Sequence, residues 1–298
     1  MMNDVVIIGA GIAGLTASIY LARSGVMPVV ICGNNPGGQL MQTDCVENYP
    51  GFEAISGAEL MMRTLSQAEK LGVKMVYEVV TGVPQSSGNF DVCLASNAKM
   101  NARAVLIATG ASHRHLGVKG ETEFTNKGVS WCATCDGAIN KGKPVAVIGG
   151  GNTAVMEALF LSNVASKVYL IHRRDTLRAD EIMQKRLFEK SNIEGVWNAE
   201  VTEIIGDTRV NAIRLNTGKV LDVSAVFVAV GVKPATDFVK DLVELDSNGY
   251  IISDETQTSV PGIFAAGDVE NGMTKQAVYA AGRGCLAAQQ IERYLGIR

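Results

Sequence analysis

The chain has little excess charge, no long apolar run and few cysteines for its length, and each shortage argues against a class of protein. Its 298 residues carry 27 Lys and Arg against 30 Asp and Glu, for a net charge of −3. Nucleic-acid-binding domains usually present a basic face, so we expect no nucleic-acid partner. The apolar runs are short and interrupted by glycine, whereas a membrane-spanning helix needs about 20 apolar residues in succession.

The N-terminus also lacks a basic leader. Only Met-Met-Asn-Asp precedes the first apolar strand at residues 5–8, so we expect no signal peptide and a cytoplasmic location. Six cysteines in a chain of this length are too few and too scattered for a disulfide scaffold. Only Cys132 and Cys135 are closely spaced, and in a reducing compartment such a pair is more often redox-active or metal-binding than structural.

What the chain does have is glycine, 32 residues of it, and an internal repeat. Residues 5–25 read VVIIGAGIAGLTASIYLARSG, and residues 145–166 read VAVIGGGNTAVMEALFLSNVAS. Each copy is an apolar run, a glycine turn and a helical segment, and a second apolar run follows it, as in a β-α-β unit of a parallel sheet. Further apolar strands end at glycine in residues 104–110 and 225–231. The sequence therefore predicts an α/β fold with two Rossmann-like, three-layer nucleotide-binding domains.

The C-terminal stretch GIFAAGD (262–268) is another short apolar strand that belongs to neither copy by position. A helical segment follows it at residues 276–295. We predict that the chain returns here to complete the first domain, which leaves the second domain inserted. The expected bounds are 1–113 and 243–298 for the discontinuous outer domain and 114–242 for the inserted domain.

The first glycine loop, GAGIAG (9–14), matches the G-x-G-x-x-G pattern of a dinucleotide site between a strand and a helix. Glycine lets the backbone approach a pyrophosphate, and the helix N-terminus offers unpaired N–H groups. The alternative is a tight turn without a ligand. The acidic residue that NAD enzymes place about 20 residues later is missing, and another glycine turn with Gly33, Gly38 and Gln39 stands there. This turn is either a flavin contact or an ordinary surface loop.

The second glycine loop, GGGNTA (149–154), has alanine in place of the last glycine. The following strand ends at His172-Arg173-Arg174, with Arg178 one helical turn beyond. Guanidinium groups at the position where NAD enzymes carry a carboxylate suit the 2′-phosphate of NADPH. The alternative is a solvated basic patch at a strand end.

The cysteine pair lies in WCATCDG (131–137), just before the second glycine loop. Two cysteines three residues apart can cycle between dithiol and disulfide, and Asp136 beside them could donate or accept a proton. A zinc site would need a second Cys or His pair at suitable spacing, and the neighbouring candidates are isolated. We therefore predict redox chemistry and no metal. Two buried structural thiols are a weaker alternative, because Asp and Gly flank the pair.

Together these segments resemble the bacterial-type, low-molecular-weight thioredoxin reductases, and the likeness runs nearly end to end. The placement of CATCD before the second glycine loop is especially specific. The motifs that carry the resemblance are GAGIAGLTASIY (9–20), GGQL (37–40), VENYPG (46–51), IATGA (107–111), WCATCDG (131–137), GGGNTA (149–154), HRRDTLRA (172–179), AAGDV (265–269) and KQA (275–277).

The resemblance implies FAD in the outer domain, NADPH in the inserted domain, thioredoxin as the protein substrate and a homodimer. It implies that Cys132 and Cys135 form the redox disulfide, with Cys135 toward the flavin and Asp136 as the acid. Which cysteine attacks the substrate stays open. The implied FAD contacts are Gly9, Gly11, Ala13, Gly14, Gly33, Gly38, Gln39, Asn48, Thr109, Gly110, Gly267, Asp268, Gln276 and Ala277. The implied NADPH contacts are Gly149, Gly151, Asn152, Thr153, His172, Arg173, Arg174 and Arg178.

One position departs from the family pattern. The family usually has arginine before Gln-Ala, and this chain has Lys275, which keeps the charge but loses the planar fork. Two other functions stay open at this point. One is a flavoprotein disulfide reductase that serves another redoxin, and the other is a nucleotide-binding redox sensor without turnover, which fold alone does not exclude.

Overall fold

The computed structural model describes residues 2–43, 45–86 and 88–297, and the chain divides into two compact units. One unit holds the chain up to Ser112 and from Lys233 onward, and the other spans His113–Val232. The crossings run through β8 (Ala111–His113) and β17 (Val232–Pro234), which pair as a two-stranded sheet. The second crossing was expected near 243 and lies ahead of it, because Val239 and Val243 are buried in the core of the first unit.

The first unit is built on an eight-stranded sheet with a parallel centre. β6 runs antiparallel to the first half of β7, and β18 runs parallel to its second half. This pairing of β18 confirms that the chain returns to complete the first unit. The strands are β1 (Met2–Ile8), β2 (Val29–Ile31), β3 (Lys74–Val76), β4 (Val80–Gly82), β5 (Gln85–Ser86), β6 (Asn89–Leu94), β7 (Lys99–Ile107) and β18 (Ile263–Ala265).

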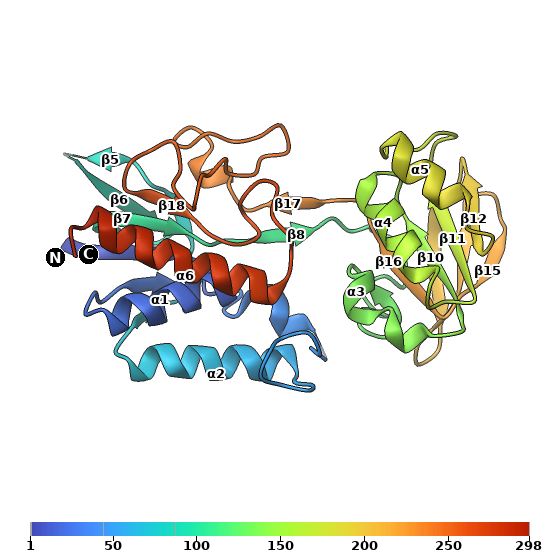
Figure 1. Cartoon of the computed structure of the whole chain (residues 1–298), viewed down its shortest axis with the longest axis horizontal. Helices are drawn as coiled ribbons and strands as arrows, with labels where there is room; N and C mark the ends of the chain where they lie inside the picture. The colour runs from blue at the N-terminus through green and yellow to red at the C-terminus, as the bar shows by residue number, and fades with distance from the viewer. Residues whose placement is uncertain (1, 44, 87, 298) are drawn as a thin grey trace. The chain divides into compact units, whose positions relative to one another are not determined.

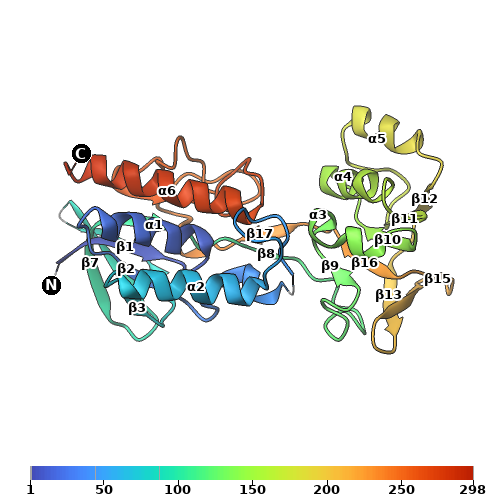
Figure 2. The ribbon, with the colours of Figure 1, turned by 60° about the horizontal axis from the view of Figure 1, so that its bottom comes forward.

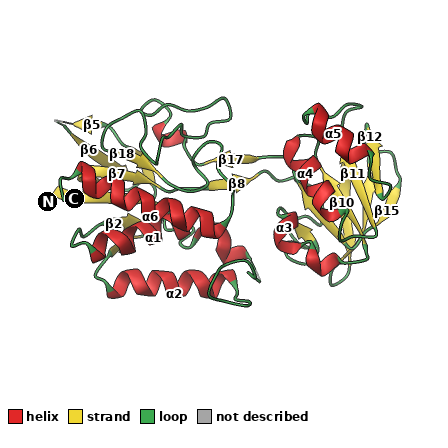
Figure 3. Ribbon diagram, in the orientation of Figure 1, coloured by secondary structure: helices red, strands yellow, loops and turns green. Residues whose placement is uncertain are grey.

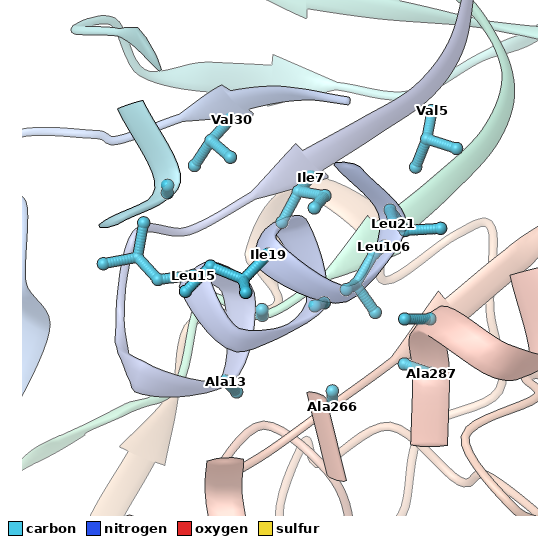
Figure 4. Packing of buried hydrophobic residues seen from close by; sticks show 14 of the residues in the cluster. Val5, Ile7, Ala13, Leu15, Ile19, Leu21, Val30, Leu106, Ala266 and Ala287 are labelled. Carbon is cyan, nitrogen blue, oxygen red and sulfur yellow. The ribbon is translucent and has the colours of Figure 1, made fainter. Parts of the chain in front are cut away.

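Side chains of β1 alternate between two cores, as the two-residue period of a strand requires. Val5 and Ile7 enter the core beneath the helices together with Leu106, as Figure 4 shows. Val6 and Ile8 enter the core on the other face, with Val105 and Ile107 of β7 among their companions. Because both faces are covered, the central strand is apolar throughout its buried part.

Three helices cover one face of this sheet. They are α1 (Ile12–Arg23), α2 (Gly57–Lys70) and α6 (Ala277–Tyr294), and α1 lies between the other two (Figures 1 and 2). The backbones of α1 and α6 approach closely, because a Cβ on Gly284 would lie 2.1 Å from the Ala13 carbonyl oxygen. Two short 3-10 helices, η1 (Gly38–Gln42) and η3 (Asp237–Val239), complete the unit.

The second unit repeats this plan with a five-stranded parallel sheet in the order β12-β11-β10-β16-β9. Helices cover one face, and a three-stranded antiparallel sheet packs on the other (Figure 3). The parallel strands are β9 (Val129–Ser130), β10 (Pro144–Ile148), β11 (Lys167–His172), β12 (Ile193–Trp197) and β16 (Ala225–Val228). The other elements are α3 (Ala133–Asp136), η2 (Ala138–Asn140), α4 (Asn152–Leu161), α5 (Glu181–Phe188), β13 (Val201–Gly206), β14 (Val210–Leu215) and β15 (Val220–Asp222).

The two predicted β-α-β units are thus β1-α1-β2 and β10-α4-β11, and the α/β fold with an inserted domain is confirmed. In each unit the first strand of the repeat lies at the centre of its sheet, with the second strand parallel beside it. The carboxyl ends of these central strands therefore carry the two glycine loops. Across the described residues, none of the helices is long and apolar enough to cross a membrane.

Candidate active site

The first glycine loop joins β1 to α1 and presents an open helix N-terminus. Gly9 has φ +115, and a Cβ there would lie 2.3 Å from the Ala108 carbonyl oxygen, so only glycine fits. A Cβ on Gly14 would lie 2.0 Å from the Gly9 carbonyl oxygen. Around Gly11, in contrast, a Cβ would meet nothing described within 4 Å, and Gly11 caps α1 without a side-chain hydrogen bond. This is the geometry that admits a phosphate to a helix N-terminus.

Two further loops reach the same helix start. Gly37 donates its N–H to the Ala10 carbonyl oxygen at 3.0 Å, which holds the second glycine turn against the first loop. Gly267 follows β18 with φ +84, and a Cβ on it would lie 3.0 Å from the Cβ of Ala13. Segments that are far apart in the sequence are therefore assembled around the N-terminus of α1.

Most of the remaining predicted FAD contacts belong to the same unit and line neighbouring loops. Asn48 donates to the Gln276 side-chain oxygen at 3.1 Å, beside the start of α6 at Ala277. Gln39 donates to the Ala111 carbonyl oxygen at 3.0 Å, and the Thr109 hydroxyl donates to the Ala235 carbonyl oxygen at 2.8 Å. Gly33 and Gly110 both have positive φ and would meet nothing described within 4 Å of an added Cβ.

Lys275, the departure from the family pattern, is anchored by Tyr250. Its ammonium group lies 2.5 Å from the Tyr250 hydroxyl and 4.3 Å from the centre of the same ring. Burial lowers the pKa of Lys275, while the carboxyl groups of Asp268 and Asp246 act in the opposite direction. Burial raises the pKa of Asp268, and the charge of Lys275 opposes that rise. The charges of Lys275 and Asp268 therefore influence each other, and lysine lacks the planar fork of arginine.

A buried ion pair holds the Gly267 turn in place. Glu270 is 1% exposed and forms a two-pronged pair with Arg283 of α6, whose Nε lies 3.0 Å from one carboxylate oxygen. The same carboxylate accepts the Gly267 N–H at 2.9 Å and the Ser253 hydroxyl at 2.7 Å. Glu270 thus ties α6, the Gly267 turn and the 253 loop together at one point.

The second glycine loop joins β10 to α4 in the same way. Gly149 has φ +152, and a Cβ there would lie 2.3 Å from the Ala229 carbonyl oxygen. Gly151 would meet nothing described within 4 Å and caps α4 without a side-chain hydrogen bond. The Arg178 N–H donates to the Gly150 carbonyl oxygen at 2.7 Å, so the arginine segment lies directly beside the loop.

The His-Arg-Arg segment divides into a buried part and an exposed part. His172 is 6% exposed, and its ring lies so close beneath Gly150 that an added Cβ would meet it at 2.3 Å. Burial lowers the pKa of His172, and the charge of Arg178 lowers it further. Arg173, Arg174 and Arg178 are exposed. The three arginines therefore carry the positive charge of this site, while a neutral His172 supports the loop.

The side chain of Asn152 is held by a different residue. It exchanges two hydrogen bonds with Asp180, one from its amide to the carboxylate at 2.9 Å and one from the Asp180 N–H at 2.8 Å. Thr153 is exposed on the first turn of α4. Asn152 thus connects the start of α4 to the start of α5.

The cysteine pair forms a disulfide. The Cys132 and Cys135 sulfurs are 2.09 Å apart, and the pair spans the short helix α3 in the second unit. Both cysteines are partly exposed, and Thr134 between them is exposed. The Asp136 carboxylate accepts the Ser130 hydroxyl at 2.5 Å, and the Ser130 oxygen accepts the Cys132 N–H at 3.1 Å. Ser130 therefore links the predicted acid to the disulfide.

A second carboxyl group, on the neighbouring helix α4, contacts the start of α3. Glu157 of α4 accepts the Ala133 N–H at 3.4 Å, between the two cysteines in sequence. Its other oxygen, Oε2, is buried and finds no hydrogen-bond partner in the described part of the chain. Burial raises the pKa of Glu157 to about 7, and the hydrogen bond from Ala133 opposes that rise.

Comparison with known proteins places this arrangement in a family. Residues 3–284 match the model of the family described as pyridine nucleotide-disulphide oxidoreductase. The chain belongs to the pyridine nucleotide-disulphide oxidoreductase family. Its similarity to individual family members covers almost the whole chain. It is 43% identical to a thioredoxin reductase of Rickettsia conorii over 98% of both chains.

Solved structures of this oxidoreductase family agree with the fold. The thioredoxin reductase of Streptococcus pyogenes matches with a TM-score of 0.94 at 42% identity, over 99% of this chain and 98% of that one. The thioredoxin reductase of Giardia duodenalis matches with a TM-score of 0.94 at 41% identity, over 99% of both chains. These likenesses extend over both units and both glycine loops.

The sequence motifs of this oxidoreductase do not include the residues that hold the Gly267 turn and the cysteine pair in place. Glu270 and Arg283, and Ser130 and Glu157 around the disulfide, stand in no motif. The signal for Glu157 in the sequence is a single acidic residue in the otherwise apolar helical segment AVMEALF (154–160).

Proposed function

We propose that this oxidoreductase is a thioredoxin-disulfide reductase that passes electrons from NADPH through FAD to the Cys132–Cys135 disulfide and on to oxidised thioredoxin. The observation that carries the proposal is the partly exposed disulfide in the same unit as the second glycine loop. The full-length similarity to thioredoxin reductases of several organisms supports the choice of substrate.

The first unit suits FAD. Gly11 leaves open space at an uncapped helix N-terminus, which can accept a pyrophosphate. We assign the contacts to the residues that the family resemblance implies, from Gly9 to Gly14 and around Gly33, Gln39, Asn48, Asp268 and Gln276. Glu270 and Arg283 lie behind these contacts and hold the Gly267 turn in place.

The second unit suits NADPH. Gly151 opens a second helix N-terminus, and Arg173, Arg174 and Arg178 provide exposed positive charge beside it. β11 is followed by Arg173 and Arg174, and the nearest carboxyl group, Asp175, comes after them. A carboxylate at the end of this strand binds a free 2′-hydroxyl, whereas guanidinium groups favour a 2′-phosphate. The preference for NADPH over NADH is thus assigned to the positive charge of the arginines that follow β11.

When bound, FAD and NADPH supply the hydride chemistry, and the chain supplies position and the disulfide. The Cys132–Cys135 bond breaks when it accepts two electrons, and protons complete the two thiols. Asp136, held by Ser130, is positioned to transfer one of them. The dithiol then reduces the partner by thiol–disulfide exchange, and its own disulfide forms again.

The test uses the purified yellow protein with NADPH, thioredoxin and a disulfide dye. We expect dye reduction that depends on both NADPH and thioredoxin. If the flavin bleaches with NADPH while no thioredoxin disulfide is reduced, the proposal fails. Turnover with another redoxin but not with thioredoxin would assign the protein to that carrier, and no turnover with either would favour a sensor. A cytoplasmic location stays a prediction from the N-terminal sequence, and a homodimer stays a prediction from the family resemblance.

A further inference from the structure

Glu157 is a partly buried carboxyl group that accepts a hydrogen bond from the backbone between the two cysteines of the redox disulfide. It lies on α4, which packs against α3, the short helix that has Cys132 as its N-cap and contains Cys135. Its Oε1 accepts the Ala133 N–H at 3.4 Å, and its Oε2 is buried without a hydrogen-bond partner in the parts of the chain described. An ionised carboxylate in such a place is costly unless something nearby compensates its charge.

We propose that Glu157 is a positioning residue of the redox pair, whose gain and loss of a proton is linked to reduction of the Cys132–Cys135 disulfide. This inference rests on the proposed function, since it concerns the same disulfide. The redox pair then has two acidic groups beside it, namely Asp136, which the sequence predicts, and Glu157 on α4. Glu157 acts through the Ala133 peptide and the local field, because no contact with either sulfur is seen.

The link follows from charge. Burial raises the pKa of Glu157 to about 7 with the disulfide intact, so part of the population is ionised near neutral pH. Reduction breaks the bond between the sulfurs and adds two electrons, and any thiolate that results places a negative charge near Glu157. Two like charges in a poorly solvated site disfavour each other, so Glu157 takes up a proton as the pair is reduced.

Other titratable groups on the elements that pack against α4 are few. On α3 they are Cys135 and Asp136, with Cys132 at its N-cap, while β10 carries none. The remaining ones are Lys167, Tyr169 and His172 of β11 and Glu181, Lys185 and Arg186 of α5. The pKa of Glu157 responds to burial first and to the Ala133 N–H second, and no charged side chain is among its causes. We therefore expect the redox state of the disulfide to determine how far Glu157 is protonated.

The test measures the equilibrium between disulfide and dithiol in the FAD-bound full chain. Wild type and Glu157→Gln are equilibrated with dithiothreitol redox buffers from pH 6 to pH 8.5, and the state of the peptide containing Cys132 and Cys135 is trapped by alkylation and read by mass spectrometry. Gln keeps the acceptor for the Ala133 N–H but never ionises. The matched control is Glu189→Gln, which removes an exposed carboxyl group just beyond α5 in the same unit.

We expect wild type and Glu157→Gln to agree within about twofold at pH 6 and to diverge as pH rises. At pH 8.5 the variant should favour the dithiol by about tenfold, the size of a solvent-screened interaction between two unit charges. Glu189→Gln should follow wild type throughout. A Glu157→Gln to wild-type ratio that stays constant across the pH range would overturn the inference.

Failure of the proposed function would look different. In that case wild type would not reduce thioredoxin with NADPH, whatever the equilibrium of the disulfide. If Glu157→Gln folds poorly, Glu157→Asp provides a second arm, since its shorter side chain keeps an ionisable group away from Ala133. It should give a pH dependence intermediate between wild type and Glu157→Gln, and a curve identical to wild type would also count against the inference.

Discussion

The buried pair of Glu270 and Arg283 provides the sharpest prediction for the flavin side of the protein. Glu270→Gln preserves the shape of the side chain but removes its charge. Arg283, whose side chain is 13% exposed, is then left as a nearly buried cation without its counter-charge. Breaking one partner of a buried pair typically costs about 3–5 kcal/mol, which exceeds the value of an ordinary hydrogen bond. We expect the free energy of unfolding to fall by that amount.

The same substitution should weaken FAD binding. The Glu270 carboxylate accepts the Gly267 N–H at 2.9 Å, and Gly267 lies against Ala13 on the first turn of α1. A less firmly held turn should raise the dissociation constant for FAD by about tenfold, the equivalent of about 1.4 kcal/mol. Urea unfolding of the protein with and without added FAD measures the first effect, and titration of the apoprotein with FAD measures the second.

An exposed pair in the same unit serves as the control. Glu59 and Arg63 on α2 form an ion pair at 2.5 Å, with side chains 52% and 62% exposed. Glu59→Gln should cost less than about 1 kcal/mol, because water screens such pairs. If Glu270→Gln lowers the free energy of unfolding no more than Glu59→Gln does and binds FAD as wild type does, the buried pair does not stabilise the Gly267 turn.

Three further predictions concern the glycine loops and the disulfide side. Replacing Arg173 and Arg174 with alanine should raise the KM for NADPH by about tenfold or more, because both charged contacts to the 2′-phosphate are lost. The KM for NADH should stay nearly unchanged, and steady-state kinetics with both nucleotides measures the two values. Gly9→Ala would place its Cβ 2.3 Å from the Ala108 carbonyl oxygen, so the variant should be purified without yellow colour. In the folded protein the pKa of Glu157 is about 7, above the ordinary 4.5, so the folded state binds this proton more tightly than the unfolded state does. Wild type should therefore lose up to about 3 kcal/mol of unfolding free energy as pH rises from 4.5 to 7.5, while Glu157→Gln should not. Urea unfolding across that pH range measures both proteins, and an equal loss in the two would contradict the prediction.

The parts of the site that sequence predicts are those in which backbone conformation demands a particular residue. Gly9 and Gly149 each sit at positive φ, where a Cβ would collide with the carbonyl oxygen of a neighbouring strand end. A sequence motif shows such a position directly, because only glycine fits there. The C-x-x-C spacing of Cys132 and Cys135 is equally local, because one short helical turn brings the two sulfurs together.

Other parts depend on contacts between distant segments, and sequence carries no local record of them. Arg283 belongs to the last helix, and only the fold brings it to Glu270. The family resemblance groups His172 with Arg173 and Arg174 as NADPH contacts, but its ring is buried beneath Gly150, because it is the last residue of β11 and faces the second glycine loop. The second crossing was placed too late because the short segment with Val239 contains no regular strand that would mark its unit.

The central claim is that electrons leave the protein through Cys132 and Cys135. The most direct measurement compares wild type with Cys135→Ser, and with Cys93→Ser as a control cysteine outside the pair, in stopped-flow reduction by NADPH followed by addition of oxidised thioredoxin. We expect NADPH to reduce the flavin in all three proteins, and only Cys135→Ser to fail in reducing thioredoxin. Reduction of thioredoxin by Cys135→Ser at the wild-type rate would contradict the claim.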